Sequence, residues 1–535
     1  MDRSGRWIAW IILATALSFS PAISFFFLSD DFYLIETARN SSIKALFSSE
    51  SWVYYRPLLL LSHAVEYPFW KASPGGYHAT NVFLHLLNTI LFCLLSRRLL
   101  RNAGSSWIFA GILFGLTPVH ASSVLWILGR TDLLCGTFYL FSVLTFFLYL
   151  EKGHPVIWGA SIFSFIGALL CKEMAGSIPL VCLIWGVIFF RKGGNFKNSF
   201  AKALKASWAY FFVLALYFGL RYLLFGHFPH NPVHGAPSVG YFLTNIGRYG
   251  VGLILPFDLE VIKPFFRPRP SLLIVGSLVV IGLSLFLLRL VIARRPLVFA
   301  SAWIGITLLP VLKFFKFYET WHLYIPSVGV ALGLGYLLGA FVWKKEITWI
   351  HKWIVATIIG IHLLGLAQIE YNTMIASRMS ERVLTGLIQY VPAAKNTILI
   401  NAPSEYRGVP VLGEKENVLI GLQLLGHPRH LQVLTSVRYA ALKDPVHISF
   451  ARAEKRIGID LEGGRNFFQL EFANMLTGRI RSQPGDIYQT PDTVIEVKAL
   501  NATGKPSSLM IRSTWLEDPS IPVLAYSECR IRFVK

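Results

Sequence analysis

Long apolar runs separated by short polar segments occupy roughly the first two thirds of the chain. A helix needs about 20 apolar residues to cross the hydrocarbon core of a bilayer, and roughly eleven runs approach that length. We place them near residues 7–28, 77–96, 107–127, 132–150, 155–171, 174–190, 207–225, 271–290, 298–315, 320–343 and 348–369. The pattern therefore predicts an all-α, multi-pass membrane domain over residues 1–372.

Beyond about residue 371 the apolar runs stop and a strand-like alternation begins. In Thr493–Leu500, three apolar residues alternate with Glu496 and Lys498, which is the period of a half-buried strand. Similar alternation occurs in 457–461, 466–472 and 509–511, whereas 414–425 has helical character. We expect a linker over 373–395 and then a small β-rich (α+β) domain over 396–535.

Composition supports the membrane class. Hydrophobic residues make up 54% of the chain and charged residues 15%, too few charges for a soluble protein of this size. The net charge of +21 indicates cytoplasmic anchoring by Lys and Arg, so we predict no nucleic-acid partner. Four of the five cysteines lie in or beside apolar runs, without disulfide or zinc spacing. The first run has no convincing cleavage site and is interpreted as a retained signal anchor.

Charge bias predicts the topology. With Arg3 and Arg6 inside, the basic short loops also fall inside, as the positive-inside rule requires. Residues 241–257 are apolar enough to be counted as a further span, which would invert everything downstream. Polar interior positions such as Asn245 and Arg248 favour an interfacial or re-entrant helix instead. The first loop, 29–76, and the C-terminal domain are then predicted to be extracytoplasmic.

Asp30 and Asp31 follow the first apolar run after a single serine. Two carboxylates at a helix C-terminus are electrostatically unfavourable, which suggests a functional reason for them. The predicted outer face also carries Arg56, Arg130, Lys172 and, at the outer end of its span, Arg221, which are cations on the side that the charge bias disfavours. Binding of an anionic group would explain them. The polar residues thus predict an active site at one membrane surface.

Seven short motifs occur in a specific order. They are Ser29-Asp-Asp-Phe32, Tyr55-Arg-Pro-Leu58, Gly76-Tyr-His-Ala-Thr-Asn-Val82 with His85, Pro118-Val-His120, Gly129-Arg-Thr-Asp132, Lys172-Glu-Met-Ala175 and Leu323-Tyr-Ile-Pro-Ser327. Over about 30–335 the chain resembles the membrane half of the transmembrane-and-tetratricopeptide-repeat O-mannosyltransferases, which are GT-C glycosyltransferases. The resemblance implies a GT-C membrane fold and a polyprenyl-phosphate sugar donor. The chain departs from the family at Glu319-Thr-Trp-His322, where an adjacent Glu-Arg is expected, and it lacks the repeats.

Sugar transfer from a lipid phosphate needs a base for the acceptor proton and cations for the departing phosphate. In GT-C enzymes the base is an acidic residue of the first external loop, which here matches Asp30 or Asp31. We assign Asp30 as the base and Asp31 as its partner, holding the acceptor or a cation. Like charges this close would raise the pKa of one carboxyl. Arg56, Arg130 and Lys172 are candidate phosphate ligands, because guanidinium groups match phosphate geometry.

Further candidates for substrate binding each have a structural alternative. The candidates are His78, His120, Asp132, Glu173, Glu319 and His322. Lys172 and Glu173 could form only the wet tip of a helical hairpin, and Arg130 and Asp132 could simply pair at a span boundary. The histidines could be packing or capping residues. No metal ligand set and no certain cofactor is predicted, and a divalent cation at Asp30 and Asp31 stays open.

These observations predict a glycosyltransferase that moves a sugar from a polyprenyl-phosphate donor to an acceptor hydroxyl. A protein acceptor is favoured, with a glycan or lipid acceptor open, and membrane lipid is the third expected partner. We expect a multi-pass protein of the bacterial inner membrane, with its active site and C-terminal domain periplasmic. A transporter or flippase for lipid-linked saccharide is the alternative, disfavoured because its charges would lie near the midplane, often with inverted repeats. An inactive relative that binds through its external domain is the third option.

Overall fold

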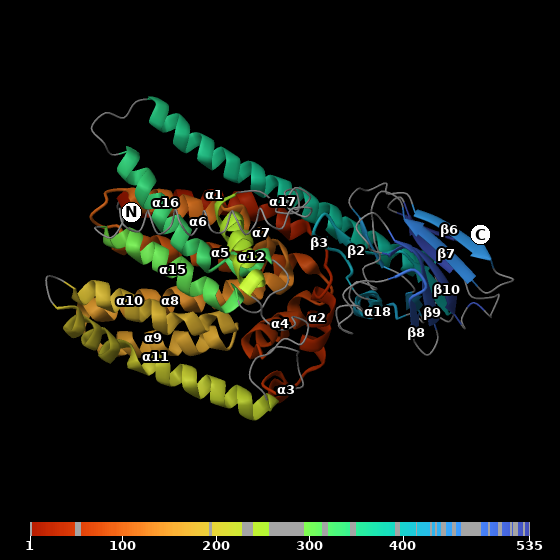
Figure 1. Cartoon of the computed structure of the whole chain (residues 1–535), viewed down its shortest axis with the longest axis horizontal. Coiled ribbons are helices and arrows are strands. Elements are labelled where there is room, and N and C mark those ends of the chain that lie inside the picture. The colour runs from red at the N-terminus through yellow and green to blue at the C-terminus, as the bar shows by residue number, and fades with distance from the viewer. Residues whose placement is uncertain are drawn as a thin grey trace. The chain divides into compact units, whose positions relative to one another are not determined.

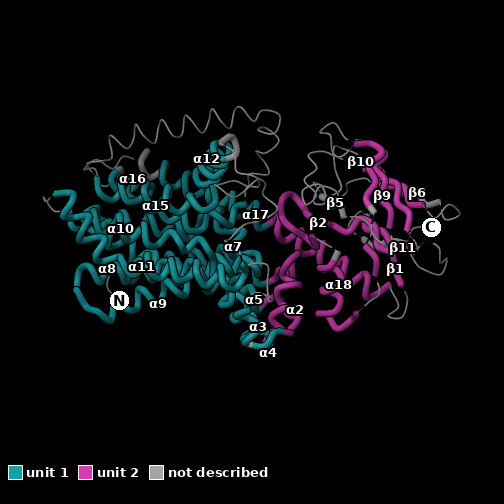
Figure 2. The backbone as a smooth tube through the Cα atoms, turned by 60° about the horizontal axis from the view of Figure 1, so that its bottom comes forward, with its two compact units in different colours: residues 1–23, 41–68, 76–370 teal, residues 24–40, 69–75, 371–535 magenta. Residues whose placement is uncertain are grey.

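The computed structural model divides the chain into two compact units (Figure 2). Unit 1 comprises residues 1–23, 41–68 and 76–370, and unit 2 comprises 24–40, 69–75 and 371–535. The structure describes residues 3–48, 55–191, 195–226, 239–255, 294–312, 319–342, 349–390, 396–413, 415–428, 431–433, 436–439, 446–451, 456–461, 483–489, 493–500, 506–513, 516, 523–527 and 530–533. Each unit is described separately below.

Unit 1 is built from helices (Figure 1). They are α1 (Arg3–Phe19), η1 (Ser20–Ser24), α3 (Ile43–Leu46), α4 (Pro57–Trp70), α5 (Pro74–Leu99), α6 (Ser106–Leu116), η2 (Pro118–His120), α7 (Ala121–Leu125), η3 (Ile127–Gly129), α8 (Arg130–Lys152), α9 (Pro155–Leu169), η4 (Glu173–Ser177), α10 (Ile178–Phe190), α11 (Phe196–Phe225), α12 (Val239–Ile254), α15 (Arg295–Leu312), η6 (Thr320–Leu323), α16 (Pro326–Val342) and the first part of α17 (Trp349–Tyr390). Over the described residues of this region, the all-α prediction is confirmed.

Seven helical stretches among the described residues are long and apolar enough to cross a membrane, or eight if the bent pair α6 and η2–α7 forms one span. The chain is therefore an integral membrane protein. The expected run at 271–290 lies outside the described residues, so the total of eleven spans stays a prediction. Residues 241–257 include α12, a single helix of 16 residues, and its placement in a membrane also stays a prediction.

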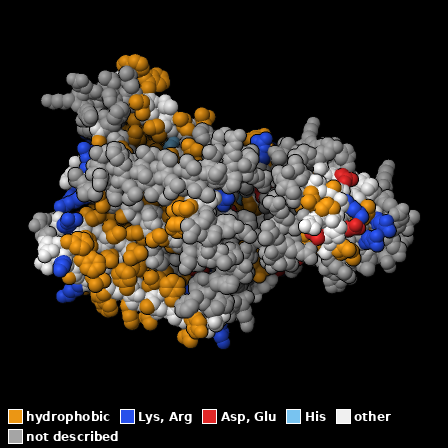
Figure 3. Space-filling model, in the orientation of Figure 1, with side chains coloured by type: hydrophobic (Ala, Val, Ile, Leu, Met, Phe, Trp, Pro, Cys, Tyr) orange, Lys and Arg blue, Asp and Glu red, His pale blue; other side chains and the backbone are white. Residues whose placement is uncertain are grey.

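The surface of unit 1 has the pattern of a membrane domain (Figure 3). Hydrophobic side chains cover the region formed by α9, α10 and α11. Phe163 of α9 and Trp208 and Leu216 of α11 are among the exposed apolar side chains of unit 1. Lys and Arg side chains gather at one end of these helices. There the Arg295 guanidinium donates to the Arg191 carbonyl oxygen at 3.1 Å. A basic helix end beside an apolar belt is the arrangement expected of a membrane surface.

Small residues allow a close contact between two helices of unit 1. A Cβ added at Gly335 of α16 would lie 2.6 Å from the backbone of Ala110 on α6. One turn further along α16, a Cβ at Gly339 would clash with Ser106. Glycine allows two backbones to approach closely, which is a common device in membrane helix pairs. The glycines of α16 thus let its backbone lie close to α6.

The first apolar run does not form one helix to its end. Helix α1 ends at Phe19, and the 3-10 turn η1, which contains Pro21, follows. Asp31 then begins helix α2 (Asp31–Asn40) of unit 2. The prediction that the two carboxylates follow a helix C-terminus is therefore wrong. They lie at a helix N-terminus, where the macrodipole favours negative charge.

Unit 2 combines α2, the end of α17 and helix α18 (Lys415–Leu424) with three sheets. The strands are β1 (Thr397–Ile400), β2 (Ala402–Tyr406), β3 (Val409–Pro410), β4 (Leu431–Val433), β5 (Ser436–Tyr439), β6 (Val446–Ala451), β7 (Arg456–Leu461), β8 (Ile487–Gln489), β9 (Thr493–Leu500), β10 (Pro506–Ser513), β11 (Val523–Ser527) and β12 (Arg530–Phe533). The orders are β12-β11-β1-β4, β6-β7-β10-β9-β8 and β3-β2-β5. A β-rich C-terminal region is thus confirmed.

The strand predictions agree with the observed burial. Ile457 and Ile459 of β7 and Leu509 and Ile511 of β10 are buried, and they are opposite one another in the antiparallel ladder. The expected strand at 466–472 lies outside the described residues. Helix α17 continues to Tyr390, so residues 373–390 of the expected linker are helical. The domain bounds themselves stay a prediction.

Candidate functional site

The polar motifs of unit 1 lie at the helix ends opposite the basic ones. Helix α8 ends at Lys152 and begins at Arg130, and α10 precedes Arg191 and follows Glu173. Helix α11 begins in the basic segment and ends soon after Arg221. Because neighbouring helices alternate in direction, residues far apart in sequence converge at this end. The predicted convergence of polar residues is seen within unit 1.

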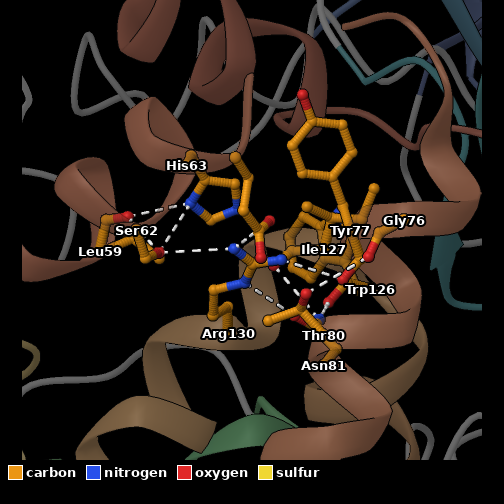
Figure 4. Close-up of polar contacts among 11 residues, drawn as sticks. Leu59, Ser62, His63, Gly76, Tyr77, Thr80, Asn81, Trp126, Ile127 and Arg130 are labelled. Carbon is orange, nitrogen blue, oxygen red and sulfur yellow. Dashed lines mark hydrogen bonds and ion pairs between the residues drawn. The ribbon is translucent and has the colours of Figure 1, made fainter. Parts of the chain in front are cut away.

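Arg130 is enclosed by residues from two helices, α4 and α5 (Figure 4). Its Nη1 donates to a Glu66 carboxylate oxygen at 2.7 Å, and its Nε donates to the Asn81 side-chain oxygen at 2.9 Å. Its Nη2 donates to the Tyr77 carbonyl oxygen at 2.9 Å. The side chain has no exposed surface. Arg130 therefore ties α4 and α5 to the start of α8, and its guanidinium is occupied by the protein itself.

His63 of α4 completes this group. Its Nδ1 lies 2.9 Å from the Leu59 carbonyl oxygen, to which it donates, and its ring stacks on Tyr77. Burial lowers the pKa of His63 well below its ordinary value, and the charge of Arg130 lowers it further. A neutral imidazole beside Arg130 adds no repulsion. The group around Arg130 is thus one buried cation balanced by one carboxylate.

A second group combines three cations with two carboxylates. Lys172 and Asp132 form a buried ion pair with a distance of 2.6 Å between Nζ and Oδ1. Glu173 pairs with Arg221 at 2.8 Å and with Arg56 at 3.4 Å. Lys172 and Arg221 are 5% and 8% exposed, whereas Arg56 is 16% exposed. This group, the ion cluster, has an excess of positive charge, and Arg56 is its most accessible cation.

His120 belongs to a buried network in the interior of unit 1. Its Nε2 donates to the Ser327 hydroxyl at 2.7 Å, and this hydroxyl in turn donates to the Tyr324 carbonyl oxygen. The Tyr324 hydroxyl donates to His85 Nδ1 at 3.0 Å, because His85 Nε2 donates to the Gly115 carbonyl oxygen. Both imidazoles are fully buried. The contacts support the structural reading of His120, as a link between η2 and the start of α16.

Three further candidates of unit 1 remain, namely His78, His322 and Glu319. His78 is buried on α5. His322 is buried on η6 and its Nδ1 lies 3.1 Å from the Tyr249 hydroxyl of α12. Glu319 immediately precedes η6.

The two acidic residues of unit 2 differ in exposure, since Asp30 is exposed and Asp31 is buried. Asp31 is fully buried, and its Oδ2 accepts the Leu28 backbone N–H at 2.9 Å. Asp30 immediately precedes α2 and its side chain has access to solvent. Protein around the carboxyl raises the pKa of Asp30, whereas hydrogen bonds from Asn417 and Ser29 lower it by less. A raised pKa was predicted at this pair from the proximity of two like charges, whereas its main cause is the displacement of water from the Asp30 carboxyl by the surrounding protein.

The comparisons agree with the motifs. Human protein O-mannosyl-transferase TMTC3 is 26% identical over 161 residues, which cover 28% of this chain and 17% of that protein. Protein O-mannosyl-transferase Tmtc2 of Drosophila melanogaster is 34% identical over 141 residues, or 25% of this chain and 15% of that protein. The chain resembles protein O-mannosyl-transferases. The predicted resemblance is confirmed, although the chain spans less than a fifth of the length of these relatives.

Family models and solved structures provide two further comparisons for this O-mannosyl-transferase-like chain. No family model matches it. Among solved structures, the crystal structure of ArnT from Cupriavidus metallidurans in the apo state matches 80% of this chain and 86% of its own chain. The TM-score is 0.40 and the sequence identity 12%.

The metal prediction stays open. Within the described parts of the chain, no group of three or more His, Cys, Asp or Glu side chains could hold a metal ion. Asp31 directs one carboxylate oxygen to the backbone of Leu28, which leaves Asp30 as the more accessible of the two.

Sequence reasoning missed several partners of the predicted residues. Glu66, Asn81 and Arg221 were not chosen as candidates, although Asn81 lies in a motif and Arg221 was a cation on the predicted outer face. Asn417, which contacts Asp30, lies 387 residues away from it in the sequence. No local pattern could have connected these two, whereas the unusual placement of Arg221 was an available signal.

Proposed function

We propose that this protein transfers a sugar, with mannose favoured, from a polyprenyl-phosphate donor to an acceptor hydroxyl at the extracytoplasmic membrane face. The motifs and the similarity to protein O-mannosyl-transferases support the class of reaction. The observation that carries the assignment of the base is the division of the acidic pair. Asp30 has solvent access and a raised pKa, whereas Asp31 is buried and bound to backbone.

The chemistry requires a carboxylate that can accept a proton. One Asp30 oxygen takes the proton of the acceptor hydroxyl while the acceptor oxygen bonds to the anomeric carbon of the sugar. The bond between that carbon and the phosphate oxygen breaks, and the lipid phosphate leaves with the electron pair. A base is most effective when its pKa lies near the working pH, so a raised pKa suits Asp30 to this role.

Asp31 has the role of an orienting residue. Its carboxylate accepts the Leu28 N–H, so it fixes the turn that precedes α2. A hydrogen bond from a backbone amide to a carboxylate at a helix N-terminus is strong and well oriented. Asp31 therefore determines where Asp30 lies without receiving the proton itself.

For the donor phosphate we favour Arg56, with Lys172 in support. Arg56 keeps exposed surface and belongs to a cluster with excess positive charge. Arg130, the third predicted ligand, is enclosed by Glu66, Asn81 and the Tyr77 carbonyl, so we assign it a structural role. Placement of the protein in a bacterial inner membrane, with a periplasmic active site and a protein acceptor, belongs to the same proposal.

The experiment is transfer from purified polyprenyl-phosphate mannose to a hydroxyl-containing acceptor peptide in nanodiscs. Asp30→Asn keeps the size of the side chain and removes the base, so turnover should fall on the order of a hundredfold or more. Asp31→Asn should retain more activity. Glu36→Gln, a carboxylate change on the same helix α2, is the control. Full activity in Asp30→Asn would remove it as the base, and absence of transfer by the unmodified protein with any lipid-phosphate sugar would overturn the proposed function.

A further inference from the structure

The turn that carries the acidic pair is held by the C-terminal part of unit 2. The Ser29 backbone N–H donates to the Val411 carbonyl oxygen at 2.7 Å. The segment 411–413, which we call the supporting loop, is itself fixed to β2. Its Val411 and Leu412 amides donate to the Ser404 and Pro403 carbonyl oxygens, at 2.8 and 3.1 Å. The central strand of the β3-β2-β5 sheet is thus connected through the supporting loop to the turn.

Ser29 has an unusual backbone conformation. Its φ is +44°, in the left-handed region that residues other than glycine rarely adopt. Such conformations persist where surrounding structure imposes them, and they are frequent at functional sites. Gly413 of the supporting loop packs directly on this residue, because a Cβ there would lie 2.6 Å from the Ser29 hydroxyl oxygen. The close contact and the bond to Val411 together hold Ser29 in this conformation.

Asn417 of α18 extends the support to the carboxyl group. Its Nδ2 donates to the Leu412 carbonyl oxygen at 3.0 Å and reaches Asp30 Oδ1 at 3.5 Å. The residue is 4% exposed. Farther along α18, a Cβ at Gly421 would lie 3.1 Å from the Phe32 ring. Helices α2 and α18 therefore pack together on the side where Asp30 lies.

We propose that the C-terminal part of unit 2 positions Asp30, through the supporting loop and Asn417. This inference rests on the proposed role of Asp30 as the base. Asn417 is a positioning residue in this proposal, because it acts on the reaction through Asp30 and does not itself touch the substrate. The β-rich region, whose role the sequence left open, is then required for turnover even if it binds no substrate.

The hydrogen bond from Asn417 has a predictable effect on titration. The amide donates to the ionised form of Asp30 and therefore lowers the pKa of this carboxyl, against the effect of burial. The Ser29 hydroxyl, the second group facing Asp30, acts in the same direction. Removing the Asn417 amide should raise the pKa of Asp30 and move the acidic limb of the turnover profile to higher pH. Loss of folded protein would lower the whole profile without moving it.

The first experiment compares two substitutions on α18. Asn417→Ala should lower kcat at neutral pH roughly tenfold, as expected for one charge-assisted hydrogen bond, with little change in the donor KM. Gln423→Ala removes a hydrogen bond from the same helix to Glu36, which bears no role in the reaction, and should leave the profile in place. An unmoved acidic limb in Asn417→Ala would overturn the positioning role.

The second experiment uses two glycines that flank α18. Gly413 and Gly426 both have positive φ, +60° and +79°, so alanine is strained at either position. A Cβ at Gly426 meets nothing within 4 Å, whereas one at Gly413 strikes Ser29. Gly413→Ala should therefore lower kcat well beyond Gly426→Ala in samples with equal amounts of folded protein. Equal kcat values for the two variants would contradict support of Asp30 by this loop.

A third measurement is independent of turnover. A water-soluble carbodiimide modifies protonated carboxyls, so the pH dependence of Asp30 labelling, read by mass spectrometry, reports its pKa in the full-length protein. The midpoint should move to higher pH in Asn417→Ala and stay unchanged in Gln423→Ala. A shifted midpoint in a protein that transfers no sugar would reject the proposed function and leave the contact established. Transfer with an unshifted midpoint would reject the positioning role alone.

Discussion

The Arg130 guanidinium lies 2.7 Å from the Glu66 carboxylate, and the Arg130 side chain is completely buried. Removing one partner from a buried pair leaves a charge without compensation, which costs about 3–5 kcal/mol. We therefore expect Glu66→Ala to lower the free energy of unfolding by about this amount, measured by denaturant titration in detergent micelles.

A second Arg–Glu pair provides the control for this prediction. Arg98 and Glu151 lie 2.6 Å apart at the basic end of unit 1, with side chains 39% and 32% exposed. Because exposed pairs contribute about 0–1 kcal/mol, Glu151→Ala should change stability little. Similar losses for the two variants would show that the enclosure of Arg130 does not matter energetically.

The ion cluster predicts a separation between binding and folding. Arg56→Gln should weaken binding of a polyprenyl-phosphate donor by about 1.5–3 kcal/mol, the value of a charge-assisted hydrogen bond, with little effect on stability. Equilibrium binding of labelled donor to protein in nanodiscs measures this change. Arg98→Gln, at the basic end, should bind donor normally. Unchanged affinity in both Arg56→Gln and Lys172→Gln would make these cations structural.

Asp30 predicts a pH-dependent cost to stability. Its pKa is raised in the folded state, so the folded state favours the protonated form. The stability contributed by this group is fully present below the pKa of an unfolded aspartate, about 3.9, and is lost as pH rises through the folded pKa. Asp30→Asn should therefore be more stable than the unmodified protein at neutral pH, with a difference that shrinks at acidic pH. Thermal unfolding at several pH values measures it, and a difference independent of pH would contradict the shift.

Two glycine substitutions should have opposite effects on stability, one at the contact between α6 and α16 and the other on α17. Gly335→Ala places a methyl group 2.6 Å from the Ala110 backbone and should cost about 1–3 kcal/mol through overpacking. Gly360→Ala on α17 meets nothing within 4 Å and should stabilise by about 0.5–1 kcal/mol, since alanine favours helix. Unfolding monitored by circular dichroism distinguishes them, and destabilisation by both would mean that space around the methyl group is not decisive.

Sequence patterns predicted the elements of this protein better than its contacts. Burial periodicity indicated β7, β9 and β10, and hydropathy indicated the long helices, because both depend on residues near each other in the chain. The first helix was predicted too long, since the apolar character of residues 20–28 continues past the turn at Pro21. Hydropathy indicates whether a segment can be buried. It does not indicate where the helical hydrogen bonds of that segment end.

The types of residue in the candidate site were predictable from the sequence, but the separate role of each residue was not. The motifs named Arg56, Arg130 and Lys172 together as cations that needed a partner. Only the contacts distinguish Arg130, enclosed by Glu66 and Asn81, from Arg56, which keeps exposed surface. Burial and hydrogen-bond partners depend on which distant segments of the chain come together. A single sequence does not show which segments do so.

The distance along the chain between Asp30 and Asn417 has a consequence for biosynthesis. These residues are 387 positions apart, so the turn with the acidic pair is synthesised long before the loop that supports it. At about 5–20 residues per second, roughly 20–80 seconds of translation separate the two. An unfinished chain inserted in the membrane would thus hold its Ser29–Asp31 turn unsupported. The maturation of the base would then coincide with the completion of the polypeptide, and a nascent chain would be inactive for most of its synthesis.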